Sequence, residues 1–134
     1  MPAYMKLGDI KGGSRDARYP GWIPVLSWSN STPRGSTDTI QVSKGADAAS
    51  PFIFMAVAEG KYFKEVVLVS ALAEPGTSYG YRLTEVYISS FDISAGVDQP
   101  KENLSLSFKS MEFLQEADLQ KYRTAAAAKP GRKR

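Results

Sequence analysis

The sequence predicts a mainly β protein of one domain, a small antiparallel β-barrel or β-sandwich with one flanking α-helix. The first observation is size and composition: 134 residues, 43% of them hydrophobic, fit a single domain with a core of its own. The second is alternation, because apolar and polar residues follow each other with a period of two in several short segments bounded by turn residues. The third is that only one segment carries clear start and stop signals for a helix. Many short strands with short turns are typical of a sandwich or a small barrel.

The N-terminal part of the chain predicts three strands. Residues 3–10 alternate in polarity and are followed by a glycine-rich turn at residues 12–14. Residues 21–29 form a second amphipathic run. It contains Pro24, which lacks the N–H that a sheet ladder needs, so this residue is expected at an edge or a bulge. The composition of residues 30–36 indicates a loop, after which residues 37–42 return as a strand.

One helix is predicted between residues 50 and 60. Ser50 offers an N-cap, Pro51 suits the first turn, and Gly60 suits a left-handed C-terminal cap. Residues 52–58 are apolar on every side, and a helix without a polar face does not lie exposed on a monomer. It is either sunk in the core or covered by another subunit, and we favour a neighbouring subunit. The side chains expected at that interface are Phe52, Ile53, Phe54, Met55 and Val57.

The C-terminal half predicts a β-hairpin and a further strand. Residues 62–72 and 78–93 are separated by a tight turn at residues 74–77 that contains proline followed by glycine. Strict alternation in the second run puts one set of large side chains on one face, and Val86 and Ile88 on the other. That set is Tyr79, Tyr81, Leu83, Tyr87, Phe91 and Ile93. Residues 95–101 indicate a loop, and residues 104–113 a last alternating segment.

Charge is unevenly distributed along the chain. Residues 119–134 contain six basic residues and no acidic one, whereas the other 118 residues hold 11 basic and 14 acidic side chains. The sequence therefore predicts a β-domain over residues 1–116 and a basic, flexible tail over residues 117–134. Residues 125–128 are alanines that could extend a short helix from Asp118. Truncation after Leu119 is expected to leave the fold intact.

The composition excludes much enzymology. The chain has no cysteine and no histidine, so it has no thiol nucleophile, no disulfide and no usual partner for a catalytic serine. Glu102, Glu112 and Glu116 are expected to be solvated, and the glycines of residues 8–13 to form turns. We expect no catalytic residue, no metal site and no cofactor. The longest apolar run has seven residues, against about 20 needed to span a bilayer. The N-terminus has no apolar signal core, so the chain is expected to be made and folded in the cytoplasm.

Four blocks of the sequence resemble the haemolysin-coregulated protein (Hcp) family, the tube protein of bacterial type VI secretion. The opening block is YMKLGDIKG at residues 4–12, followed by GWIPVLSWS at residues 21–29. The helix and following strand match at residues 49–66, and the last two blocks are YRLTEVYISSF at residues 81–91 and ENLSLSF at residues 102–108. The resemblance covers roughly residues 3–116, with the blocks in the order of the family.

The resemblance implies a β-barrel with one helix that assembles into a hexameric ring with an open lumen. Rings would stack into a tube inside a contractile sheath, and the secreted tube would carry a spike protein and effectors. The expected partners are therefore further copies of the chain, the sheath, the spike protein and effectors, with no membrane and no specific nucleic acid. The protein would leave the bacterial cytoplasm by type VI secretion without a cleaved signal peptide. We also expect the loop that contains Thr32, Pro33, Arg34, Gly35 and Ser36 to reach the next ring.

Two other functions are compatible with parts of the sequence. The first is a tail-tube subunit of a phage or another contractile injection device, which has the same architecture but other partners. The second is a nucleic-acid-binding β-barrel that uses Trp28, Tyr79 and Tyr81 as stacking platforms together with the basic tail. The excess of acidic residues outside the tail argues against this second function.

Overall fold

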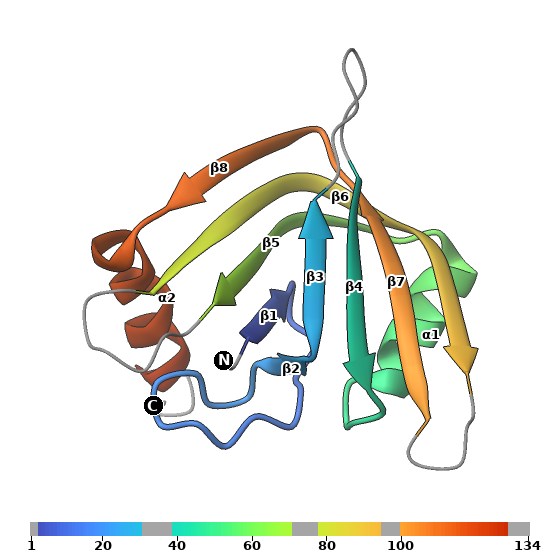
Figure 1. The fold of residues 1–134 in the computed structure, drawn as a ribbon, viewed down its shortest axis with the longest axis horizontal. Coiled ribbons are helices and arrows are strands. Elements are labelled where there is room, and N and C mark those ends of the chain that lie inside the picture. The colour runs from blue at the N-terminus through green and yellow to red at the C-terminus, as the bar shows by residue number, and fades with distance from the viewer. Residues whose placement is uncertain (1–2, 31–38, 71–77, 95–99, 129–134) are drawn as a thin grey trace.

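The computed structural model describes residues 3–30, 39–70, 78–94 and 100–128, and the side chains up to residue 122. Eight strands and two helices lie within these ranges (Figure 1). The N-terminal elements are β1 (Ala3–Leu7), β2 (Ile23–Val25), β3 (Ser27–Asn30), β4 (Thr39–Gly45) and α1 (Ser50–Glu59). The C-terminal elements are β5 (Tyr62–Ser70), β6 (Tyr79–Ser94), β7 (Lys101–Ser107), β8 (Ser110–Leu114) and α2 (Glu116–Ala128). No helix in this part of the chain is long and apolar enough to cross a membrane.

All strands belong to one antiparallel sheet in the order β2-β1-β5-β6-β7-β4-β3, with β8 as a further partner of β6. The long strand β6 is central, because β8 pairs with its first half and β7 with its second half. The predicted β5–β6 hairpin is confirmed, since Ser70 pairs with Tyr79, although its expected turn at residues 74–77 lies outside the described residues.

The predicted mainly β, antiparallel fold is confirmed, and its sheet curls strongly without closing completely (Figure 1). The two end strands, β2 and β3, are joined through Leu26, whose N–H donates to the Ser43 carbonyl of β4. No strand pairing between β2 and β3 completes the circle among the described residues. Pro24 lies in the end strand β2, as its missing N–H predicts.

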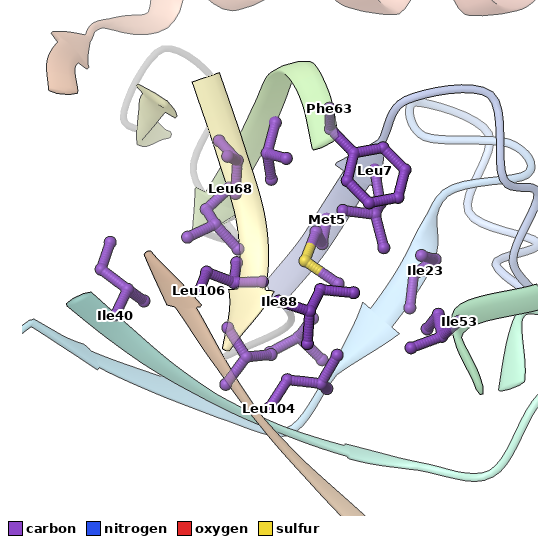
Figure 2. Packing of buried hydrophobic residues seen from close by; sticks show 14 of the residues in the cluster. Met5, Leu7, Ile23, Ile40, Ile53, Phe63, Leu68, Ile88, Leu104 and Leu106 are labelled. Atoms are coloured by element: carbon purple, nitrogen blue, oxygen red, sulfur yellow. The ribbon is translucent and has the colours of Figure 1, made fainter. Parts of the chain in front are cut away.

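The main core lies on the concave side of the curled sheet. Buried side chains from β1, β2, β4, β5, β6 and β7 meet there, and Ile53 of α1 packs against them (Figure 2). Leu104 and Leu106 point inward from β7, as the alternation of that segment predicts. Only one side of α1 packs into this core, because Ile53 and Ala56 are the buried residues of the helix.

Strict alternation fails within β6, so the predicted faces of this strand are partly wrong. Leu83 is buried, but so are Val86 and Ile88, whereas Tyr87 is exposed. The reason is Glu85, which has a φ of 54° and so turns the following residues over. A further register shift follows at residues 88–90, where β6 pairs with β7.

A second helix, α2, lies beside the one flanking helix of the predicted fold, and it contains the helix that the sequence offers from Asp118 through the alanines of residues 125–128. Its Leu119 is fully buried against the convex side of the sheet, in a cluster with Tyr4, Tyr19, Trp22, Val67, Val69 and Leu114. The Tyr122 side chain packs partly against the same cluster. The first part of the segment in which the sequence favours a flexible tail is thus a helix that covers the sheet. Its burial depends on contacts with β1 and β5, which are distant in the sequence.

Candidate functional site

Helix α1 presents large apolar side chains to solvent. Phe52, Phe54 and Met55 are 57%, 59% and 54% exposed. Ile53 and Ala56 are buried, and Val57 packs partly against the core. At about 100° per residue, Ile53, Ala56 and Val57 lie on one side of the helix and the three exposed side chains on the other. We call Phe52, Phe54 and Met55 the α1 patch.

The five helix residues predicted at a subunit interface therefore divide into two groups. The α1 patch is available to a neighbour. Ile53 is not, because it is fully buried in the core of its own chain, where Figure 2 shows it beside Ile23. Val57 is largely occupied in the same way. The all-round apolar composition of residues 52–58 could not separate the two sides.

The α1 patch extends over the strand beside it. The Phe54 and Phe91 rings lie 6.5 Å apart at 60°, an edge-to-face geometry. Ile93, two residues further along β6, is 59% exposed. Phe52 and Met55 also line a shallow pocket with Ile10 and Lys61. The exposed apolar surface is thus continuous from the helix towards the end of β6.

A buried charged network holds the N-terminus of α1. The Lys44 ammonium is fully buried and lies 2.6 Å from Glu102 Oε1 and 3.1 Å from Asp47 Oδ1. It also donates to the Gly45 carbonyl at 2.8 Å. The Ser50 hydroxyl donates to the same Glu102 oxygen at 3.0 Å. This network joins β4, β7 and the first turn of α1.

Two predictions about this network are wrong. Glu102 is not solvated but 3% exposed, because β7 pairs with β4 and sets Glu102 opposite Lys44. Ser50 is the first residue of the helix and not its N-cap, a position that Ala49 occupies without a side-chain cap. The Asp47 carboxylate instead accepts from the Ala49 N–H at 3.0 Å. The C-terminal prediction is confirmed, since Gly60 has a left-handed φ of 64°.

The convex face of β3, β4, β7 and β6 carries short uncharged polar side chains at its centre. Ser105 Oγ donates to Gln41 Oε1 at 2.8 Å, and Ser90 donates to Ser105 at 2.9 Å. Beside them, Ser107 donates to Ser89 and Ser43 donates to Asn103. Side-chain hydrogen bonds of hydroxyl and amide groups thus link three strands, β4, β7 and β6. We call this surface the hydroxyl face.

Charged groups gather on the other part of the convex side, near α2. Arg82 of β6 is paired with Glu65 of β5 and with Glu112 of β8, and the bond to Glu65 raises the pKa of Arg82. The Glu65 carboxylate also accepts from the Tyr122 hydroxyl at 3.3 Å. Glu112 is exposed and Glu116 is half-buried, in contrast to the buried Glu102. The Glu116 carboxylate also accepts a hydrogen bond from the Ser78 N–H.

Burial raises the pKa of two tyrosines on this side of the sheet. For Tyr122, burial acts first and the Glu65 charge second. For Tyr4, burial is reinforced by its hydrogen bond to Asp16 at 2.9 Å. Burial alone would raise the pKa of Asp16, but bonds from the Arg18 N–H and from Tyr4 lower it below its usual value. These groups form structural contacts between the N-terminal loop, the sheet and α2.

Two other sets of predicted site residues have different outcomes. The loop residues Thr32, Pro33, Arg34, Gly35 and Ser36, predicted to stack rings, lie outside the described residues. The aromatic residues of the nucleic-acid alternative do not form an open platform. Trp28 and Tyr81 meet edge to face at 6.2 Å and pack against the core, and Tyr79 is stacked on Phe113.

Comparison of the chain with known proteins shows the family to which it belongs. The model of the family described as "Type VI secretion system effector, Hcp" matches residues 4–114. The chain belongs to this family. Protein hcp1 of Pseudomonas aeruginosa is 27% identical to it over 128 residues, with 81% of this chain and 79% of that protein covered. The crystal structure of Hcp1 from Salmonella typhimurium matches with a TM-score of 0.77 at 26% identity, covering 84% of this chain and 83% of that one.

The resemblance seen in the sequence is thus confirmed, and with it the assignment of this Hcp chain to the tube proteins of type VI secretion. Proteins of this family are secreted by that system. The alternative of another contractile device has weaker support. The baseplate structure of the anti-feeding prophage matches with a TM-score of 0.51 at 10% identity, which shows a shared fold alone.

Proposed function

We propose that this Hcp chain is a structural subunit that closes with five further copies into a ring, and that the rings stack into a tube. The observation that carries the proposal is the α1 patch, three large apolar side chains that the chain leaves more than half exposed. A closed ring covers such a surface on every subunit without forming open fibres. The role is structural and involves no chemical step.

The size of the α1 patch supports burial against a neighbour. At roughly 200 Å² for a large side chain, the three residues leave about 350 Å² of apolar surface in water. Burial of that area stabilises a contact by about 9 kcal/mol before the cost of association, which is of similar size. A single contact would therefore be weak, whereas a closed ring in which every subunit makes two contacts is favoured.

The hydroxyl face is the surface that we assign to the lumen. A channel filled with water needs a polar wall, and a wall without charge at its centre does not retain passing cargo of either sign. Serine, glutamine and asparagine side chains that bond to each other in the plane of the sheet provide such a wall. Effectors are the expected cargo, and the sheath and the spike protein are the expected partners outside and at the tip.

The tube would form in the bacterial cytoplasm and leave it through the type VI apparatus. We assign the stacking of rings to Thr32, Pro33, Arg34, Gly35 and Ser36, because their composition predicts a loop between two strands and such a loop can reach a flat neighbouring face. Deletion of residues 32–36 is expected to leave hexamers intact and to abolish tubes in electron micrographs. Unchanged tubes would show that another segment stacks the rings.

The ring itself is tested by light scattering on a sizing column, with negative-stain images of the peak. We expect a mass near six protomers and annular particles. Phe54→Glu should shift the mass to that of one protomer, because a charge would be buried without a partner. Gln120→Glu, an exposed change on α2, is the matched control and should leave the ring intact. A wild-type chain that is monomeric at high concentration would refute the proposal.

A further inference from the structure

The side of α1 that packs into the core is not the side with the larger apolar surface. Ile53 and Ala56 are buried, whereas Phe52, Phe54 and Met55 are more than half exposed. The three exposed side chains carry more apolar area than the small ones that face the core. Burial of apolar area alone would therefore favour the opposite rotation of the helix about its axis. Another interaction is needed to determine which side of α1 faces the sheet.

The buried network of Lys44, Asp47, Ser50 and Glu102 has the geometry to do this. The hydroxyl of Ser50, the first residue of α1, donates to Glu102 Oε1 of β7 at 3.0 Å and accepts from Lys44 Nζ of β4 at 3.2 Å. At about 100° per residue, Ser50 lies on the same side of the helix as Ile53. A rotation of α1 about its axis would therefore pull this hydroxyl away from both of its partners in the sheet.

Asp47 joins the same end of the helix to the loop between β1 and β2. Its carboxylate accepts from the Ala49 N–H at 3.0 Å and from the Gly13 N–H at 2.9 Å, and it lies 3.1 Å from Lys44 Nζ. The Asp47 N–H in turn donates to the Ser50 hydroxyl at 3.0 Å. The first turn of α1 is thus bonded to β4, to β7 and to the N-terminal loop.

Buried charges of this kind discriminate between arrangements more than they stabilise the fold. The desolvation of Lys44 and Glu102 offsets most of their mutual attraction, so that the pair adds little net stability. A rotated α1 would, however, take the Ser50 hydroxyl away from the buried Glu102 carboxylate, and a buried polar group that loses a partner is strongly unfavourable. The network therefore disfavours the rotations that apolar burial alone would permit.

We propose that the buried network sets the rotation of α1 about its axis, and so determines that the α1 patch faces solvent. Lys44, Asp47, Ser50 and Glu102 are positioning residues, because they hold the helix and the helix presents the patch. The consequence for assembly rests on the proposed ring, whereas the rotation itself is a property of the single chain.

The test is the reactivity of single cysteines, introduced into a chain that has none of its own, towards a water-soluble maleimide. Ala56 is 5% exposed, so Ala56→Cys should be labelled slowly. Replacement of the buried pair by Lys44→Met together with Glu102→Leu should accelerate this labelling by roughly tenfold or more, as for the loss of one or two hydrogen bonds. Val67→Cys, fully buried under α2, is the matched control and should stay slow, because it reports opening of the whole fold.

A milder variant tests the helix end alone. Ser50→Ala removes the hydroxyl that reaches Glu102 and should accelerate the labelling of Ala56→Cys several-fold. Ser110→Ala removes a hydroxyl that is hydrogen-bonded to Thr84 on the β8 side of the sheet, and should leave that labelling unchanged. On a sizing column, the variant without the buried pair should lose the peak of six protomers, because its α1 patch is no longer presented in one orientation.

The outcomes separate this inference from the proposed function. Continued protection of Ala56→Cys without the buried pair would overturn the inference, since packing of Ile53 would then set the rotation by itself. Equal acceleration at Ala56→Cys and Val67→Cys would also overturn it, because the network would then stabilise the fold as a whole. If the variant without the pair does not fold, Ser50→Ala decides with the same two cysteines. A monomeric wild-type chain would refute the ring and leave the labelling test in force.

Discussion

Replacement of Glu102 tests whether the buried network at the start of α1 stabilises the fold. Glu102→Gln keeps the shape of the side chain but removes its charge, and Lys44 then retains Asp47 at 3.1 Å and the Gly45 carbonyl at 2.8 Å. Because Lys44 keeps part of its compensation, we expect a loss of about 2–3 kcal/mol in the free energy of unfolding.

Lys44→Met should cost more. It leaves the Glu102 carboxylate, 3% exposed, with Ser50 as its remaining hydrogen-bond partner among the contacts described above. Removal of one member of a buried pair costs about 3–5 kcal/mol, because the other charge remains desolvated. The double variant with Lys44→Met and Glu102→Leu should be more stable than Lys44→Met alone, since no charge is then left unpaired in that pair.

The assay is equilibrium unfolding in urea, followed by far-ultraviolet circular dichroism. Because assembly adds stability that depends on concentration, each variant is measured at two protein concentrations and compared with wild type at the same concentration. The reasoning is refuted if Glu102→Gln and Lys44→Met each lose less than about 1 kcal/mol, or if the double variant is no more stable than Lys44→Met alone.

Three further predictions concern stability. Leu119→Ala should cost about 3 kcal/mol in urea unfolding, since this leucine of α2 is fully buried against the sheet; a loss below about 1 kcal/mol would mean that α2 does not cover the sheet. The raised pKa of Tyr4 and Tyr122 gives stability that is present below the ordinary tyrosine pKa of about 10 and is lost as pH rises through the higher folded value. The melting temperature should therefore fall above about pH 10, and less steeply in the variant with both Tyr4→Phe and Tyr122→Phe; equal slopes would contradict this. Gly80→Ala should destabilise strongly, because the added Cβ would lie 2.1 Å from the Leu68 carbonyl oxygen, whereas Gly13→Ala meets its nearest atom at 3.6 Å and should be tolerated.

Short sequence patterns were enough to predict the features of the fold that depend only on residues close together in the sequence. The position of α1 follows from Pro51 in its first turn and from Gly60, whose left-handed φ ends it. The edge position of Pro24 follows from its missing N–H. The faces of β7 follow from strict alternation, whereas those of β6 do not, because the left-handed Glu85 reverses the order and no local signal marks this residue.

Composition, alternation and the four family-like blocks were enough to predict a β-rich domain of the Hcp family, with an apolar helix at residues 50–60 that needs cover. Tertiary structure decided which side of that helix is free. It also decided that Lys44 meets Glu102, that Leu119 is covered, and that β8 pairs with the end of β6 that lies away from α1. The physical reason is that these contacts join residues of distant strands. Their positions depend on the register and curvature of the whole sheet, which no short segment encodes.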